Sequence, residues 1–102
     1  MNSINKLISD FLIFGCVYYE FGKSLIPDEK YDLICLELLQ RFDELENSNH
    51  IHKNLITKEM LVNQSCFDLS NKFPNIVKNC ALDIINNVVY KKKEIKNIND
   101  LF

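Results

Sequence analysis

Three tyrosines and two aspartates lie close enough along the chain to form one binding site. Tyr18 and Tyr19 are adjacent, and Asp28, Tyr31 and Asp32 follow at i, i+3 and i+4, a spacing that places them on one face of a helix. Tyrosine rings attract a cationic aromatic group, and carboxylates neutralise its charge or accept hydrogen bonds from sugar hydroxyls. The pattern predicts a site for such a ligand. The alternative is boundary packing by the tyrosines and compensation of a helix dipole by the aspartates.

Two helices must position these side chains. Apolar residues recur three and four apart over 3–21, where Ser3 is a candidate N-cap and Gly22 a candidate terminator. Pro27 suits the first position of a second helix, whose apolar stripe continues to residue 46. Because the connector is short, we expect an antiparallel helical hairpin that brings Tyr18 and Tyr19 beside the acidic start of the second helix.

The remainder of the chain predicts two more helices and no sheet. Thr57 is a candidate cap for a short helix over 57–64, and Phe73-Pro74 precedes a long helix over 74–94. The 102 residues contain two glycines and two prolines, and 47 % of them are apolar. We therefore expect an all-α fold in a single domain, 1–102, with one hydrophobic core.

Charge and length disfavour nucleic acid and membranes as partners. The net charge is −2, and the single basic run, Lys91 to Lys93, suits the solvated end of a helix better than a phosphate-binding patch. The apolar stretch 11–19 is about half the length that spans a bilayer, and no small-residue cleavage site follows it. These features predict a cytoplasmic protein.

Cysteine and histidine offer little catalytic chemistry. The spacing of Cys16, Cys35, Cys66 and Cys80 contains no Cys-x-x-Cys pair and predicts buried free thiols. The pair at 50 and 52, His-x-His, has no further ligands in register, so we expect solvated histidines and no metal site. Without a nucleophile beside a base or a glycine-rich phosphate loop, no catalytic residues are assigned and the protein is expected not to be an enzyme.

A longer pattern extends from the tyrosine pair into the second helix. Tyr18-Tyr19, Pro27-Asp28 and Tyr31-Asp32 are followed by a leucine-rich segment, 38–46. This pattern resembles the N-terminal helical domain of bacterial NAD-dependent DNA ligases, in which Tyr-Tyr or Tyr-His precedes Asp-x-x-Tyr-Asp and a leucine-rich helix. The similarity covers about 4–46, with a fainter match at 55–57, so 1–46 is the part similar to the ligase domain and 55–102 is divergent.

The resemblance implies a ligand and roles for the five residues. The ligase domain closes over the nicotinamide mononucleotide (NMN) half of NAD. Tyr18 would stack on the nicotinamide ring, and Asp28, Tyr31 and Asp32 would contact its amide and ribose. Tyr19 stands where some relatives have a histidine. The chain lacks the Lys-x-Asp-Gly motif that carries adenylation in the ligases. The resemblance thus implies a non-catalytic protein with no required cofactor that binds NMN or NAD weakly.

A second interpretation is a module that binds or inhibits a protein and uses the hairpin as a scaffold. The abundance of lysine, asparagine and isoleucine beside a single arginine, Arg41, is typical of A+T-rich genomes such as those of many phages. A phage or mobile-element protein of the host-takeover or anti-defence type, acting in the host cytoplasm on an unidentified protein partner, would fit this composition.

Overall fold

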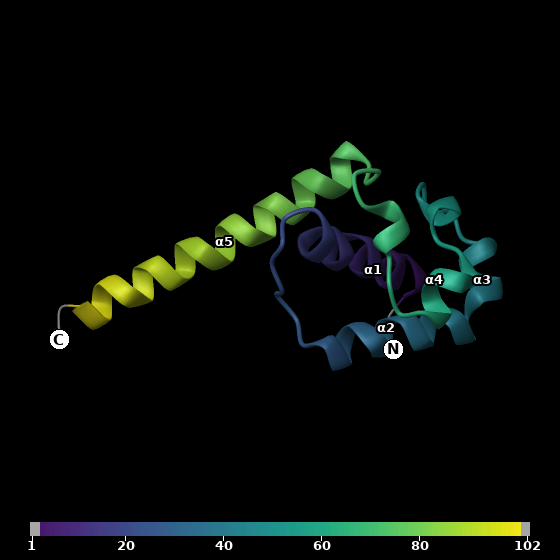
Figure 1. The fold of residues 1–102 in the computed structure, drawn as a ribbon, viewed down its shortest axis with the longest axis horizontal. Helices are drawn as coiled ribbons and strands as arrows, with labels where there is room; N and C mark the ends of the chain where they lie inside the picture. Colours follow the sequence, from purple (N-terminus) through teal and green to yellow (C-terminus); the bar gives the residue numbers. More distant parts are fainter. Residues whose placement is uncertain (1–2, 101–102) are drawn as a thin grey trace.

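The protein is built from helices packed around a central one (Figure 1). The computed structural model describes residues 3–100, with side chains described as far as residue 87. Over 3–100 the chain forms helices, turns and loops and no strand, which confirms the all-α prediction. In chain order the elements are α1 (Ile4–Tyr19), α2 (Asp28–Gln40), α3 (Phe42–Glu46), η1 (Lys53–Leu55), α4 (Lys58–Val62), η2 (Phe67–Leu69) and α5 (Asn75–Asp100), where η marks a 3₁₀ turn.

Helix α1 is the centre of the core and packs against α2, α3 and α5. Its apolar stripe supplies the largest fully buried side chain, Phe11, and α2 adds Cys35 and Leu38 from the facing side. Burying these side chains removes apolar surface from water, which is the main favourable contribution to folding. The other large contributions from α1 are Leu7, Ile8, Leu12, Cys16 and Val17.

Both ends of α1 follow the sequence prediction closely. The Ser3 hydroxyl accepts a hydrogen bond from the Lys6 amide at 3.1 Å, so Ser3 is confirmed as the N-cap. The helix ends at Tyr19, two residues before the expected end. Gly22 follows with a φ of +65°, and its amide donates to the Tyr18 carbonyl. This left-handed conformation favours glycine and turns the chain toward α2.

The expected continuous helix over 27–46 is wrong in two respects. Pro27 is the N-cap residue, with ψ 149°, and lies one position before the helix. The helix then breaks at Arg41, whose φ of −110° and ψ of 29° lie outside the helical region. The Arg41 guanidinium bonds to Glu37 before the break and to Glu44 after it. After the break, Leu45 of α3 lies in the core, where it is 1 % exposed.

The two C-terminal helices differ from their predicted lengths. Thr57 is confirmed as the cap of α4, because its hydroxyl accepts from the Met60 amide at 3.2 Å. Helix α4 ends at Val62 instead of 64, since Gln64 adopts a φ of 55°. Helix α5 runs to Asp100, beyond the expected 94.

Helix α5 packs on α1 only through its first turns. Val77 and Ala81 are buried against the core, and the helix then extends away from the other elements (Figure 1). The side chains of Val88, Val89 and Lys91 to Lys93 lie outside the described residues. Over the described part of the chain, no helix combines the length and apolar character needed to cross a membrane.

Candidate functional site

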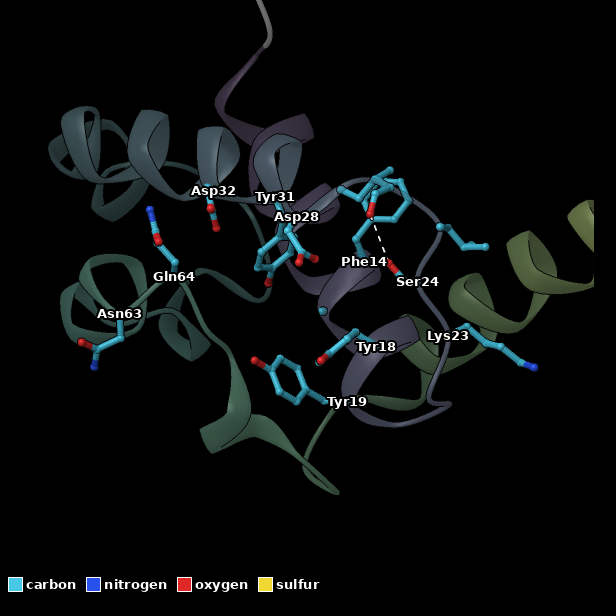
Figure 2. Close-up of a pocket in the computed structure, with 13 residues that line it drawn as sticks. Phe14, Tyr18, Tyr19, Lys23, Ser24, Asp28, Tyr31, Asp32, Asn63 and Gln64 are labelled. Atoms are coloured by element: carbon cyan, nitrogen blue, oxygen red, sulfur yellow. Dashed lines mark hydrogen bonds between the residues drawn. The ribbon is translucent and has the colours of Figure 1, made fainter.

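All five residues predicted to form a site line one pocket of about 310 Å³. Figure 2 shows it between the end of α1, the start of α2 and the segment that follows α4. A volume of this size is at the lower end of those typical of small-molecule sites, about 300–1,000 Å³. Beside Tyr18, Tyr19, Asp28, Tyr31 and Asp32, the lining comprises Phe14, Gly15, Lys23, Ser24, Leu25, Ile26, Asn63 and Gln64.

The side chains of the adjacent Tyr18 and Tyr19 differ in their contacts and in their exposure to solvent. Tyr19 is held by its neighbours, because its hydroxyl shares a 2.8 Å hydrogen bond with Ser65 and its ring meets Phe67 edge-on at 6.0 Å. Tyr18 contacts Tyr19 at a centroid distance of 4.9 Å with the planes at 83°, yet 55 % of Tyr18 is exposed. Tyr19 therefore supports Tyr18, and Tyr18 offers ring surface to a ligand.

Tyr31 forms the inner wall of the pocket. Its ring stacks on Phe11 with centroids 5.5 Å apart and planes at 19°. Its hydroxyl donates to the Phe11 carbonyl at 3.0 Å and lies 3.4 Å from Cys66 Sγ. Burial raises the pKa of Tyr31 far above its usual value, so the phenol stays neutral. Because a hydroxyl has one proton, Tyr31 has none left to donate to a ligand ribose.

A glycine in α1 makes this inward position of Tyr31 possible. A Cβ built on Gly15 would overlap Cys66 Sγ and would lie 2.8 Å from the Tyr31 hydroxyl. Real Cβ atoms do not approach other atoms this closely. Gly15 thus allows α1, Tyr31 and Cys66 to meet at the floor of the pocket.

The two carboxylates of the site are unpaired. Asp28 lies exposed in the first turn of α2, and Asp32 is half-buried one turn later. Figure 2 shows both directed into the space between α2 and the tyrosines. Among the residues with described side chains, neither forms a hydrogen bond or an ion pair. Lys23 belongs to the opposite rim, and its ammonium points away from the tyrosines (Figure 2).

Sequence reasoning missed three parts of the lining, the first of which is Phe14 and Gly15 on α1. Asn63 and Gln64 follow α4 and enter the wall because the positive φ of Gln64 ends that helix early. The connector 23–26 contributes the opposite wall, where Ser24 Oγ donates to the Ile26 carbonyl at 3.2 Å. The polar triplet 63–65 signals a turn in the sequence. Its proximity to α2 comes from the packing of α4 on α2, which no local pattern encodes.

The cysteines near the site are unreactive by environment. All four thiols are free; Cys16, Cys35 and Cys66 are buried as predicted, and Cys80 is half-buried. Burial raises the pKa of Cys16 and of Cys66 to about 11 and that of Cys35 to about 12. Since the thiolate is the nucleophile, these three thiols are inert near neutral pH.

The prediction that His50 and His52 are solvated is wrong. Both are half-buried. His50 Nδ1 accepts a hydrogen bond from the His52 amide at 3.1 Å, so the proton of the neutral ring lies on Nε2 and is donated to Ser9 Oγ at 2.9 Å. In this tautomer Nε2 cannot act as a base toward Ser9. The contact instead fastens the connector 47–54 to α1.

These histidines border a smaller, mainly apolar pocket of about 190 Å³ between α1 and α5. His52 Nε2 is buried without a hydrogen-bond partner among the described residues. Within that part of the chain, no three histidine, cysteine or acidic side chains are grouped as metal ligands would be. At the edge of this pocket the side chain with an unused polar atom is therefore His52.

Acidification is expected to loosen the connector 47–54. Burial, together with the neighbouring His52, lowers the pKa of His50 below 6.5. A lowered folded-state pKa gives stability that is present above the unfolded value and is lost as pH falls through the folded one. Protonation of His50 Nδ1 would also break the hydrogen bond that this nitrogen accepts from the His52 amide, because two N–H groups would then face each other. We therefore expect a change from pH 7.5 to pH 5 to lower the Tm of the native chain more than that of His50→Asn. An equal decrease in both proteins would contradict this role for His50.

Comparisons of the chain with protein-family models, with curated proteins and with solved structures give no match.

Proposed function

We propose that this chain is a non-catalytic protein whose pocket binds a nicotinamide nucleotide, either NMN or the NMN half of NAD. The observation that carries the proposal is the combination, in one pocket, of an exposed Tyr18 ring with the unpaired carboxylates of Asp28 and Asp32. Oxidised nicotinamide is a planar cation, and an aromatic face beside negative charge attracts such a ring. The resemblance of 4–46 to the ligase domain points to the same ligand.

The roles of the residues follow from their environments. Tyr18 stacks on the nicotinamide ring, because its ring is the most exposed of the three tyrosines. Asp28 and Asp32 accept hydrogen bonds from the carboxamide and the ribose. Tyr19 and Tyr31 shape the wall, since Ser65 and the Phe11 carbonyl already occupy their hydroxyls. The ligase resemblance implies a direct ligand contact for Tyr31. Because its hydroxyl donates to the Phe11 carbonyl, that contact is made by the Tyr31 ring.

The same contacts limit the affinity. Stacking contributes about 1–3 kcal/mol and each of two charge-assisted hydrogen bonds about 1.5–3 kcal/mol. Loss of translational and rotational freedom opposes them by at least about 4 kcal/mol, so the net binding free energy is at most about 5 kcal/mol and the Kd is no lower than about 0.2 mM. Weak, rapidly exchanging binding is therefore part of the proposal. A partner that closes over the exposed side of Tyr18 would strengthen it.

A two-dimensional NMR titration of the full chain tests the function. NMN and NAD are expected to give saturable shifts that cluster at Tyr18, Asp28 and Asp32. AMP, which lacks a cationic ring, and reduced NMN, whose ring is neutral, serve as matched controls and are expected to leave these resonances almost unchanged. Equal shifts with oxidised and reduced NMN would show that the positive charge of the nicotinamide ring does not contribute to binding. No shift with any ligand would reject the function.

The chemistry of the remaining residues supports a non-catalytic role. The pKa values of the buried thiols are raised to about 11 or 12, which removes Cys16, Cys35 and Cys66 as nucleophiles. His50 presents a proton to Ser9 and cannot activate it. The proposed ligand is bound without a required cofactor.

Exposed apolar side chains favour a second candidate, a module that binds or inhibits a protein. Leu33 and Leu36 on α2 are 63 % and 47 % exposed, and Val62 on α4, which packs against α2, is 63 % exposed. Apolar side chains exposed on neighbouring elements suit a protein partner. Capture of one defined protein that survives Asp28→Asn with Asp32→Asn but is lost in folded Leu36→Glu would favour this candidate.

A further inference from the structure

We propose that the pocket selects its ligand through the nicotinamide nucleoside end alone, so that nicotinamide riboside binds at least as tightly as its 5′-phosphate, NMN. This inference rests on the proposed function and names the ligand class within it. The feature that carries it is the charge of the lining, which favours a cation and offers a phosphate no cationic partner inside the pocket.

The lining holds two carboxylates and one ammonium group. Asp28 and Asp32 lie one helical turn apart and face the same space (Figure 2). Neither is neutralised by a described side chain. The charges of Asp28, Asp32 and Lys23 leave the wall with a net charge of −1. A phosphate monoester carries nearly two negative charges at neutral pH, and the wall repels it while attracting the ring.

The cationic features near the pocket do not offset this repulsion. The Lys23 side chain is exposed on the far rim and its ammonium points outward (Figure 2). The first turn of α2, where backbone N–H groups could bind an anion, already carries Asp28 and Glu29. These carboxylates already compensate the positive end of the helix dipole, so a phosphate bound there would gain little further electrostatic stabilisation.

Two of the four hydroxyl protons of the lining are also committed. Ser24 donates to the Ile26 carbonyl and Tyr31 donates to the Phe11 carbonyl, while the Tyr19 hydroxyl shares a hydrogen bond with Ser65 in which either oxygen can donate. The other neutral side-chain donors are the amides of Asn63 and Gln64 and the Tyr18 hydroxyl. Neutral donors stabilise a doubly charged phosphate much less than an arginine or lysine would. The same amides suit the hydroxyls of a ribose.

Parallel titrations of the full chain with nicotinamide riboside and with NMN test the inference. At 50 mM NaCl the riboside is expected to bind about three- to tenfold more tightly, and the ratio is expected to approach one at 500 mM because salt screens the phosphate repulsion. Lys23→Gln removes the one cationic side chain of the lining and is expected to increase this ratio by no more than about twofold, since the exposed ammonium is screened by solvent.

The outcomes separate this inference from the function itself. Tighter binding of NMN than of the riboside would overturn the inference and leave nicotinamide nucleotide binding intact, and loss of that advantage in Lys23→Gln would identify the lysine as the phosphate contact. Saturable binding of neither compound would overturn both. An equal or lower Kd for the riboside supports the inference at either salt concentration.

Discussion

Gly15→Ala is expected to destabilise the fold, although alanine is the better helix former. Replacing glycine by alanine within a helix ordinarily stabilises it by about 1 kcal/mol. Here the added methyl overlaps Cys66 Sγ and crowds the Tyr31 hydroxyl at 2.8 Å, and neither can retreat because Cys66 is buried and the Tyr31 ring stacks on Phe11. Overpacking of this kind costs about 1–3 kcal/mol, occasionally more, and overlap with a buried sulfur places this case at about 2–3 kcal/mol. After the gain in helix propensity we expect a net loss of about 1–2 kcal/mol, seen as a decrease in Tm of roughly 5–15 °C.

A second substitution identifies the cause. Cys66→Ala removes the sulfur that the new methyl would overlap, while the Cys66 Cβ at 3.6 Å remains in ordinary contact. Gly15→Ala and Cys66→Ala together should therefore be more stable than the sum of the single losses predicts, by about 1–2 kcal/mol of coupling in chemical denaturation. Additive losses would show that the sulfur is not what excludes a side chain at residue 15.

The position of the candidate site was predictable because short-range rules fix it. The spacing of Asp28, Tyr31 and Asp32 requires one helical face, and the short connector that follows α1 brings that face near Tyr18. Caps were predictable for the same reason, since Ser3 and Thr57 each bond an amide three residues ahead. All of these rules act over a few residues.

Features that depend on tertiary packing were not predictable. The break at Arg41 interrupts a stripe that remains apolar on both sides, so the apolar pattern alone does not reveal it. His50 looks like a solvated loop residue until Ser9, 41 positions away, supplies its partner. Gln64 enters the pocket through a positive φ that no side-chain type in the segment requires. A contact between distant segments decides the position of His50, and no local pattern signals the other two features.

Replacing Asp28 and Asp32 together with asparagine is expected to weaken binding of nicotinamide riboside by at least tenfold, the largest functional effect of any change in the pocket. Asparagine keeps the size of each side chain and removes its charge. Each hydrogen bond to a charged group is worth about 1.5–3 kcal/mol, whereas a neutral one contributes about 0.5–1.5 kcal/mol. NMR titration of the variant measures the loss.

Stability should respond differently from binding in this variant. The charge of Asp28 stabilises the N-terminal end of α2 by about 0.3–1 kcal/mol, whereas its repulsion with Asp32 one turn away destabilises the helix by about 0.2–0.5 kcal/mol. Removing both charges therefore changes the free energy of unfolding very little. Glu29→Gln with Asp43→Asn is the matched control, because it removes two carboxylates from first helical turns outside the pocket. The control should bind as the native chain does. If both double variants bound equally, net charge and not the pocket would govern the affinity, whereas a selective loss with unchanged Tm would assign Asp28 and Asp32 to the ligand.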